Sequence, residues 1–398
     1  MPKPILVLNA GSSSIKFGLF DTADTWAGHL FAGEVADIGD KPHLTVKDMD
    51  SKIILDRSWP LPRKQEDILQ DILGWTDERA GTDGLAAIGH RIVHGGSQFI
   101  APVRLDQETI DQLSRLTPMA PLHQEACLVP VRALLSLRPN LMQIGCFDTA
   151  FHSALKPPVS RFALPRSYEE SGIRRYGFHG LSYEFIAGRL KEISPALAGK
   201  RTVVAHLGSG ASLCAMRNGR SLDTTMGFTP LDGLMMGTRC GTIDPGILLY
   251  LLRERGMSAE DLEQLLYHKS GLLGVSGISS EMRALLSSSD RRAAEAVELF
   301  AFEVAKAICT MALTLEGLDC LVFTGGIGEH AAKVRAMVCN RLHWMGLELD
   351  PQANNVDADV ISLDSSSVET RVIRTSEETS IARQVVPFVL SEKRTNSI

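Results

Sequence analysis

Long hydrophobic runs are absent from this sequence of 398 residues, and no apolar stretch approaches the length that spans a bilayer. The chain also opens on a strand-like segment and has no charged and then apolar leader. We therefore expect a cytoplasmic protein without a membrane partner.

Paired cysteines and an excess of positive charge are missing as well. The seven cysteines are scattered and never spaced as C-x-x-C, so they indicate neither a disulfide framework nor a structural zinc site. The formal net charge of -6 argues against nucleic acid as a partner. The G-x-S-x-G elbow of serine hydrolases does not occur. Because the chain has no excess of positive charge, a few specifically positioned Lys or Arg side chains would have to bind any anionic ligand.

Length and hydrophobic pattern favour two domains, because 398 residues, 44% of them hydrophobic, exceed one ordinary core. Alternating stretches over 1–60 predict a meandering sheet. The elements expected next are helices at 65–76 and 106–116 around a strand at 86–89, strands around 202–228, helices near 244–254, 258–268 and 290–317, and a strand at 320–323. This sheet-then-helix order, occurring twice, predicts duplicated α/β domains packed around a cleft.

The end of the chain has its own pattern. It predicts a loop at 362–370, a strand at 372–375 and a helix over 377–386 that returns to the first domain. The polar tail at 391–398 is expected to be frayed.

Glycine-rich turns of one kind occur twice. The runs N-A-G-S-S-S-I-K at 9–16 and H-L-G-S-G-A-S at 206–212 each lie between apolar stretches, which predicts strand, tight turn, strand. Exposed N–H groups and hydroxyls in such turns suit phosphate oxygens. A third run, T-G-G-I-G-E at 324–329, follows an apolar strand and precedes a helical stretch. One turn alone could be an ordinary hairpin, but the three together favour phosphate or nucleotide binding.

Charged side chains near other predicted strand ends suit a small anionic substrate. Arg91 could clamp a carboxylate or phosphate, or make a surface ion pair. Asp148 could orient a nucleophile, pair an arginine, support a metal or cap a helix. His179, near a predicted helix start, is placed to donate to an oxyanion, and Arg239 is the most exposed cation of a long irregular segment. His123, alone in an apolar loop, is more readily explained as structural.

In their order along the chain, these motifs resemble those of acetate kinases. The matching runs are N-A-G-S-S-S-I-K-F, H-R-I-V-H-G-G, A-P-L-H, F-D-T-A-F-H, Y-G-F-H-G, H-L-G-S-G-A-S, T-M-G-F-T-P-L-D-G-L-M-M-G-T-R, F-T-G-G-I-G-E and T-S-E-E. The resemblance covers nearly the whole chain at compatible spacings.

The resemblance implies an α/β fold of two duplicated actin-like (ribonuclease H-like) domains, each a mixed sheet with flanking helices, with a cleft between them. The N-terminal domain would comprise 1–150 plus about 375–398, and the C-terminal nucleotide-binding domain 151–374. The protein would be a homodimer that reversibly transfers the γ-phosphoryl group of ATP to acetate, giving acetyl phosphate and ADP. Mg²⁺ would be the metal, with Mn²⁺ as the alternative.

Site residues follow from the same resemblance, position by position. It implies Arg91, Asp148, His179 and Arg239 at the transferring group, with Arg91 also binding substrate. It implies Val93, Leu122, Phe178 and Pro230 around the substrate methyl group, and Asn9 and Glu377 at the metal. At the nucleotide it implies Lys16, His206, Leu207, Gly208, Ser209, Gly210, Glu281, Met282, Arg283, Gly325, Gly326, Ile327, Gly328 and Glu329.

Acetate is already an anion, so the reaction needs no general base. Alignment and neutralisation of charge supply most of the rate of phosphoryl transfer. We therefore expect Asp148 to orient the arginines or the metal shell.

The sequence departs from the usual family pattern at a few positions, without loss of a proposed catalytic side chain. These are Gln124, Leu181, Tyr183, Ser209, Thr242 and His330. A propionate kinase or another short-chain fatty-acid kinase, an ATPase of chaperone or actin type, and an inactive nucleotide-binding paralogue are the alternatives.

Overall fold

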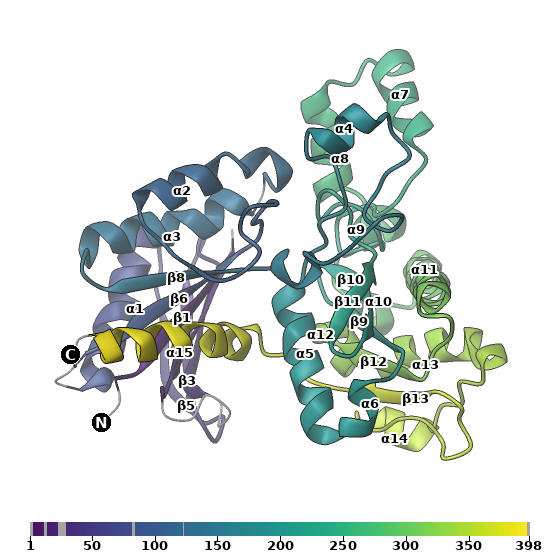
Figure 1. The fold of residues 1–398 in the computed structure, drawn as a ribbon. Coiled ribbons are helices and arrows are strands. Elements are labelled where there is room, and N and C mark those ends of the chain that lie inside the picture. The colour runs from purple at the N-terminus through teal and green to yellow at the C-terminus, as the bar shows by residue number, and fades with distance from the viewer. Residues whose placement is uncertain (1–2, 12–13, 23–28, 82–83, 122, 396–398) are drawn as a thin grey trace. The chain divides into compact units, whose positions relative to one another are not determined.

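The chain forms two compact units, each built on its own sheet (Figure 1). A computed structural model describes residues 3–11, 14–22, 29–81, 84–121 and 123–395. The N-terminal unit comprises Met1–Phe151 with Ser376–Ile398, and the C-terminal unit comprises His152–Thr375. The last helix therefore belongs to the unit in which the chain begins.

The N-terminal unit has an eight-stranded sheet in the order β5-β4-β3-β2-β1-β6-β8-β7. Its strands are β1 (Ile5–Ala10), β2 (Ile15–Phe20), β3 (His29–Ala36), β4 (His43–Asp48), β5 (Ile53–Ser58), β6 (Ala87–Ile92), β7 (Val103–Arg104) and β8 (Met142–Phe147). Its helices are α1 (Gln65–Ala80), α2 (Gln107–Ser114), α3 (Gln124–Leu137) and α15 (Glu377–Thr395), with short 3-10 helices at Thr117–Met119 and Ala150–His152.

Helices cover both faces of this sheet. Leu6 and Leu8 of β1 belong to a core that includes Ile68 of α1. Toward the other face, a Cβ at Gly89 of β6 would lie 2.6 Å from Ile381 Cγ2 of α15. Glycine at this position therefore allows α15 to pack directly on the strands that carry the site.

The C-terminal unit has a five-stranded sheet in the order β11-β10-β9-β12-β13. Its strands are β9 (Thr202–Leu207), β10 (Ala211–Arg217), β11 (Arg220–Thr224), β12 (Cys320–Thr324) and β13 (Glu369–Val372). Its helices are α4 (Arg166–Glu170), α5 (Gly180–Ile193), α6 (Pro195–Ala198), α7 (Pro245–Glu254), α8 (Ala259–His268), α9 (Gly271–Ser276), α10 (Met282–Ser287), α11 (Arg291–Leu315), α12 (Gly325–His330), α13 (Ala332–Arg341) and α14 (Pro351–Asn355), with a 3-10 helix at His343–Met345. The long α11 packs its apolar face on β9 and β10.

The same five-strand arrangement occurs in both sheets. In the first, β1 pairs antiparallel with β2 and β2 with β3, while β1 pairs parallel with β6 and β6 with β8. In the second, β9, β10, β11, β12 and β13 repeat these pairings in the same order and sense. The prediction of duplicated α/β domains with mixed sheets and flanking helices is confirmed.

Two predicted elements were wrong in detail. The last strand is Glu369–Val372 and not 372–375, because it is set by its pairing with β12, from Cys320↔Glu369 to Phe323↔Val372. The third glycine run follows β12 and precedes the helix α13, as predicted, and its own residues also form the short helix α12.

The last helix continues to Thr395, although it was expected to end at 386 before a frayed tail. Ile381, Val385 and Val389 are buried and continue one apolar face beyond Pro387, so packing carries the helix through the proline. Among the described residues no helix is both long and apolar enough to cross a bilayer.

Candidate functional site

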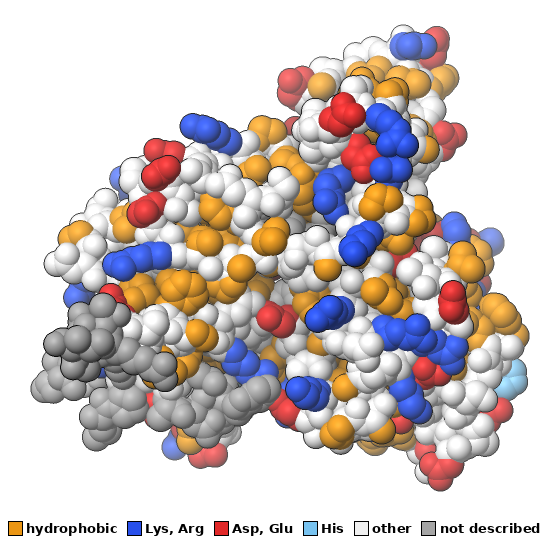
Figure 2. Space-filling view, in the orientation of Figure 1, with side chains coloured by type: hydrophobic (Ala, Val, Ile, Leu, Met, Phe, Trp, Pro, Cys, Tyr) orange, Lys and Arg blue, Asp and Glu red, His pale blue; other side chains and the backbone are white. Residues whose placement is uncertain are grey.

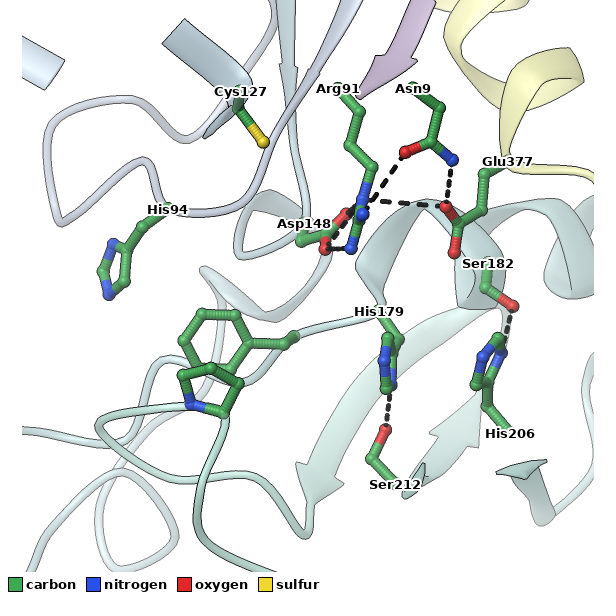
Figure 3. A network of polar contacts seen from close by, with 12 residues as sticks. Asn9, Arg91, His94, Cys127, Asp148, His179, Ser182, His206, Ser212 and Glu377 are labelled. Atoms are coloured by element: carbon green, nitrogen blue, oxygen red, sulfur yellow. Dashed lines mark hydrogen bonds and ion pairs between the residues drawn. The ribbon is translucent and has the colours of Figure 1, made fainter. Parts of the chain in front are cut away.

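Four polar residues meet at one edge of the N-terminal sheet (Figure 3). Asn9, Arg91 and Asp148 lie at or directly after the ends of β1, β6 and β8. These strands are parallel neighbours, so their ends reach the same edge. Arg91 Nε donates to both Asp148 oxygens, at 3.1 and 3.2 Å, and Arg91 Nη2 donates to Oδ2 at 2.6 Å. Glu377 Oε2, at the start of α15, lies 3.6 Å from Arg91 Nε.

This ion pair is largely removed from solvent. The Asp148 side chain is 1% exposed and that of Arg91 20%. Burial opposes the charge on Arg91, but Asp148 and Glu377 outweigh burial and hold the Arg91 pKa well above its ordinary value. Arg91 therefore remains a cation, and its contacts with Asp148 fix the plane of the guanidinium. A guanidinium held in this way suits carboxylate or phosphoryl oxygens.

Two carboxylates at the start of α15 face Asn9. Asn9 Nδ2 donates to Glu377 Oε2 at 2.9 Å and to Glu378 Oε1 at 3.2 Å. Burial, and then the neighbouring charge of Glu377, raise the pKa of Glu378. A cation bound beside these carboxylates would favour the ionised form of Glu378 and so oppose both causes of its raised pKa. These oxygen donors are of the type that Mg²⁺ prefers. In the described part of the chain, no group of three or more His, Cys, Asp or Glu side chains is placed to hold a metal. Mg²⁺ here would need further ligands, such as substrate phosphates.

Lys16 lies opposite Asn9 in the hairpin of β1 and β2. Gly11 N donates to Ser14 O at 2.8 Å and closes the turn, while positions 12 and 13 lie outside the described residues. Lys16 borders an open pocket of about 410 Å³, which Gly18, Glu34, Lys47 and Glu378 also line. The strand, turn, strand prediction is confirmed for this hairpin and for the second, formed by β9 and β10.

In the C-terminal unit, His179 directly precedes α5 in a left-handed conformation, with φ of 56°. Its Nδ1 lies 2.8 Å from Ser212 Oγ of β10 (Figure 3). Its Nε2 faces Gly210, where a Cβ would lie 3.2 Å from Nε2 and 3.9 Å from Arg239 Nη2. Arg239 Nη1 donates to Pro230 O at 2.9 Å. The missing side chain at Gly210 thus leaves a space where an imidazole and a guanidinium converge, an arrangement suited to an anionic oxygen.

A second imidazole supports the first. The rings of His206 and His179 stack, with centroids 4.4 Å apart and 25° between their planes. His206 Nδ1 lies 2.9 Å from Ser182 Oγ, which lies 2.8 Å from Thr375 Oγ1. Thr375 N in turn donates to Glu329 Oε1 at 3.1 Å. Hydrogen bonds therefore connect the second hairpin with the third glycine run.

The third glycine run, Gly325–Glu329, is held against the second hairpin. Gly325 has a φ of +76°, and a Cβ there would lie 2.8 Å from Leu207 O, so the close approach requires glycine. Glu329 Oε1 accepts a hydrogen bond from Gly325 N at 2.9 Å. The fully buried Arg335 donates to the carbonyls of Gly328 and Glu329, both at 2.9 Å.

The predicted segment 281–283 begins α10, with Met282 buried in the core. A Cβ at Gly237 would lie 3.3 Å from Ser280 O and 3.5 Å from Ser209 O. This segment therefore adjoins the second hairpin. All three predicted nucleotide segments of the C-terminal unit come together.

The residues expected around the substrate methyl group are divided between the units. Val93 is 3% exposed in the N-terminal unit, and Phe178 is 1% exposed in the C-terminal unit, where Pro230 is also buried. Leu122 lies outside the described residues. The expected residues at the transferring group divide in the same way, with Arg91 and Asp148 in one unit and His179 and Arg239 in the other.

Several polar residues of these clusters were not assigned a role from the sequence. They are Ser182, Tyr183, Ser212, Thr375 and Glu378. Ser212 closes the run H-L-G-S-G-A-S and Glu378 closes T-S-E-E, so both signals lay inside motifs already noted.

Comparison with known proteins gives a consistent result. The chain matches the Acetokinase family over residues 4–383. It is 50% identical over 390 residues to the acetate kinase of Rhodopseudomonas palustris (strain TIE-1), a match that covers 97% of this chain and 98% of that relative.

Solved structures agree. The propionate kinase of Francisella tularensis matches with a TM-score of 0.89 and 34% identity, over 96% of this chain and 99% of that one. The acetate kinase of Porphyromonas gingivalis matches with a TM-score of 0.84 and 36% identity, over 98% and 100%. With the two repeated sheets, these likenesses confirm the predicted two-domain actin-like fold.

Proposed function

We propose that this chain, which belongs to the Acetokinase family, reversibly transfers the γ-phosphoryl group of ATP to acetate, giving acetyl phosphate and ADP. Family membership makes it a phosphotransferase with a carboxyl group as acceptor. The observation that carries the proposal is the space at Gly210, on which His179 Nε2 and Arg239 Nη2 converge. Two such donors can stabilise the charge that gathers on the oxygens of a transferring phosphoryl group.

Arg91 is proposed to hold the acetate carboxylate. Asp148 orients the guanidinium of Arg91. The bound acetate is already an anion, so its carboxylate acts as the nucleophile without a general base. Val93, Leu122, Phe178 and Pro230 remain the proposed lining of the methyl pocket.

The nucleotide is proposed to bind along the second hairpin, the start of α10 and the third glycine run, with Lys16 at its phosphates. The contacts between these segments of the C-terminal unit support that assignment. Asn9 and Glu377, joined by Glu378, would hold Mg²⁺, or Mn²⁺ as the alternative. The metal, when bound, supplies charge neutralisation at the phosphates.

We further propose a cytoplasmic homodimer. No residue of α7 is buried within the chain, and its Ile247, Leu249 and Tyr250 are 47, 51 and 51% exposed. Apolar side chains gathered on one exposed helix are typical of a protein interface. The cytoplasmic part of this proposal is supported by the scattered spacing of the seven cysteines, which contains no C-x-x-C pair.

Trapping acyl phosphate with hydroxylamine tests the activity. The purified chain with ATP, Mg²⁺ and acetate should form acetyl hydroxamate, and ADP should not accumulate without acetate. Because one solved neighbour is named a propionate kinase, formate, propionate and butyrate are assayed in parallel. A higher kcat/KM for propionate would make that acid the substrate, and ADP formation independent of any acid would make the chain an ATPase.

Two arginine variants test the site. Arg91→Ala and Arg239→Ala should each lower kcat by about 10³ while the protein stays folded, since an arginine at a phosphoryl transition state contributes about that much or more. Arg291→Ala is the control, because the Arg291 side chain is 90% exposed and pairs with Glu295 one helical turn away. Near-normal kcat in either test variant would remove that arginine from the site.

A further inference from the structure

Tyr183 forms the far end of a buried chain of hydroxyls behind His179. The side chain of Tyr183 is fully buried in α5. Its hydroxyl lies 2.5 Å from Ser212 Oγ, and the same oxygen lies 2.8 Å from His179 Nδ1. Tyr183 N also donates to His179 O at 3.1 Å, so both residues occupy one side of the first helical turn. Ser212 therefore bridges the two rings.

The direction of these hydrogen bonds follows from acidity. A phenol is a stronger hydrogen-bond donor than an aliphatic hydroxyl, whose oxygen is the better acceptor. Burial raises the pKa of Tyr183 well above its ordinary value, so the phenol keeps its proton. Donation from Tyr183 to Ser212 Oγ leaves the single Ser212 proton to be donated to His179 Nδ1.

We propose that Tyr183 is a positioning residue which, through Ser212, holds neutral His179 in the tautomer that carries its proton on Nε2. The proposal rests on the role of His179 in the function proposed above. His179 Nε2 is the nitrogen that faces the space at Gly210. The relay thus lets an uncharged imidazole donate to an anionic oxygen. His179 would therefore still donate from Nε2 at pH values above the ordinary histidine pKa of about 6.5.

Two further titratable groups adjoin His179. His206 stacks on its ring, and Arg239 Nη2 faces the same space at Gly210 as His179 Nε2. Around Tyr183, burial lowers the pKa of His152 to about 4, and burial raises the pKa of the Cys214 thiol, so both stay neutral near pH 7.

The pH dependence of Tyr183→Phe tests the relay. Wild-type kcat should stay level from about pH 6 to 9, across the ordinary histidine pKa. The variant should lose about tenfold in kcat at the upper end and much less near pH 6, where a protonated imidazole donates from Nε2 in any case. KM for ATP should change little. Tyr176→Phe is the matched control, because Tyr176 is also a buried residue and its hydroxyl donates to Gly172 O at 2.9 Å, outside the relay.

The Ser212→Ala background provides a second test. Since Tyr183 acts through Ser212, Tyr183→Phe should have no further effect on kcat in Ser212→Ala. A Tyr183→Phe loss that is equal at every pH, or that persists in the Ser212→Ala background, would show a merely structural role and overturn the proposal.

Nitrogen NMR of the ¹⁵N-histidine-labelled wild type reads the tautomer without any folding risk. The His179 signals, assigned by their loss in His179→Gln, should show a protonated Nε2 and an unprotonated Nδ1 at pH 8. A proton on Nδ1 would overturn the relay. Full kcat in His179→Gln would instead remove His179 from the proposed function, while the tautomer measurement would still decide the relay.

Discussion

Replacing Gly210 with alanine should abolish most phosphoryl transfer and leave the fold intact. The new Cβ would lie 3.2 Å from His179 Nε2, 3.5 Å from its Cε1 and 3.9 Å from Arg239 Nη2. An oxygen bound by these donors would need to lie about 2.7–3.1 Å from them. The methyl group would therefore occupy the space that the oxygen needs.

The magnitude follows from the lost donors. Removing one donor of this type costs about 2.7–4 kcal/mol in the transition state, which is about 10²–10³ in kcat. Because both His179 and Arg239 face the methyl group, we expect a loss of about 10³. Stability should change by less than about 1 kcal/mol, since Gly-to-Ala replacements at compatible positions lower the entropy of the unfolded chain. Gly210 is compatible because it has no positive φ, and its closest new contact needs only a small shift.

The assay measures kcat by the hydroxylamine trap and the free energy of unfolding by urea denaturation. Gly199→Ala is the control in the same unit, because the nearest atom to its Cβ would be Asn218 Oδ1 at 3.4 Å. It should retain both kcat and stability. A Gly210→Ala protein with wild-type kcat and unchanged stability would show that no reacting oxygen occupies this space.

Three further predictions concern other parts of the molecule. Asp148→Asn keeps the shape but removes the charge that orients Arg91, so kcat at saturating substrate should fall about 100-fold; unchanged kcat would leave Asp148 a structural partner. Val93→Ala should raise kcat/KM for propionate relative to acetate up to about tenfold by relieving overpacking, and an unchanged ratio would contradict the pocket. Burial lowers the pKa of His90 and His152 to about 4, so between pH 6.5 and 4 the unfolded chain binds more protons than the folded chain. The free energy of unfolding, measured by urea titration, should therefore fall by about 2 kcal/mol per histidine from pH 7 to 5. A free energy of unfolding that does not change over this range would contradict the prediction.

Local sequence signals were sufficient for both hairpins and for most helices. Glycine and apolar alternation act over a few residues, so the turns at Gly11 and Gly208 could be predicted where the structure has them. The bounds of β13 and α15 could not be predicted from local signals. Those of β13 depend on its pairing with β12, and the end of α15 depends on the packing of Ile381 and Val389.

The sequence by itself determined which residue types are available for the proposed chemistry, since their motifs could be identified along the chain. Tertiary structure decided how they act on one another. Arg91 and Asp148 are 57 positions apart and meet because β6 and β8 are parallel neighbours. Ser212 reaches His179 from β10, 33 positions away. Hydrogen bonds act over about 3 Å, and only the pairing of distant strands and helices brings such groups within that range.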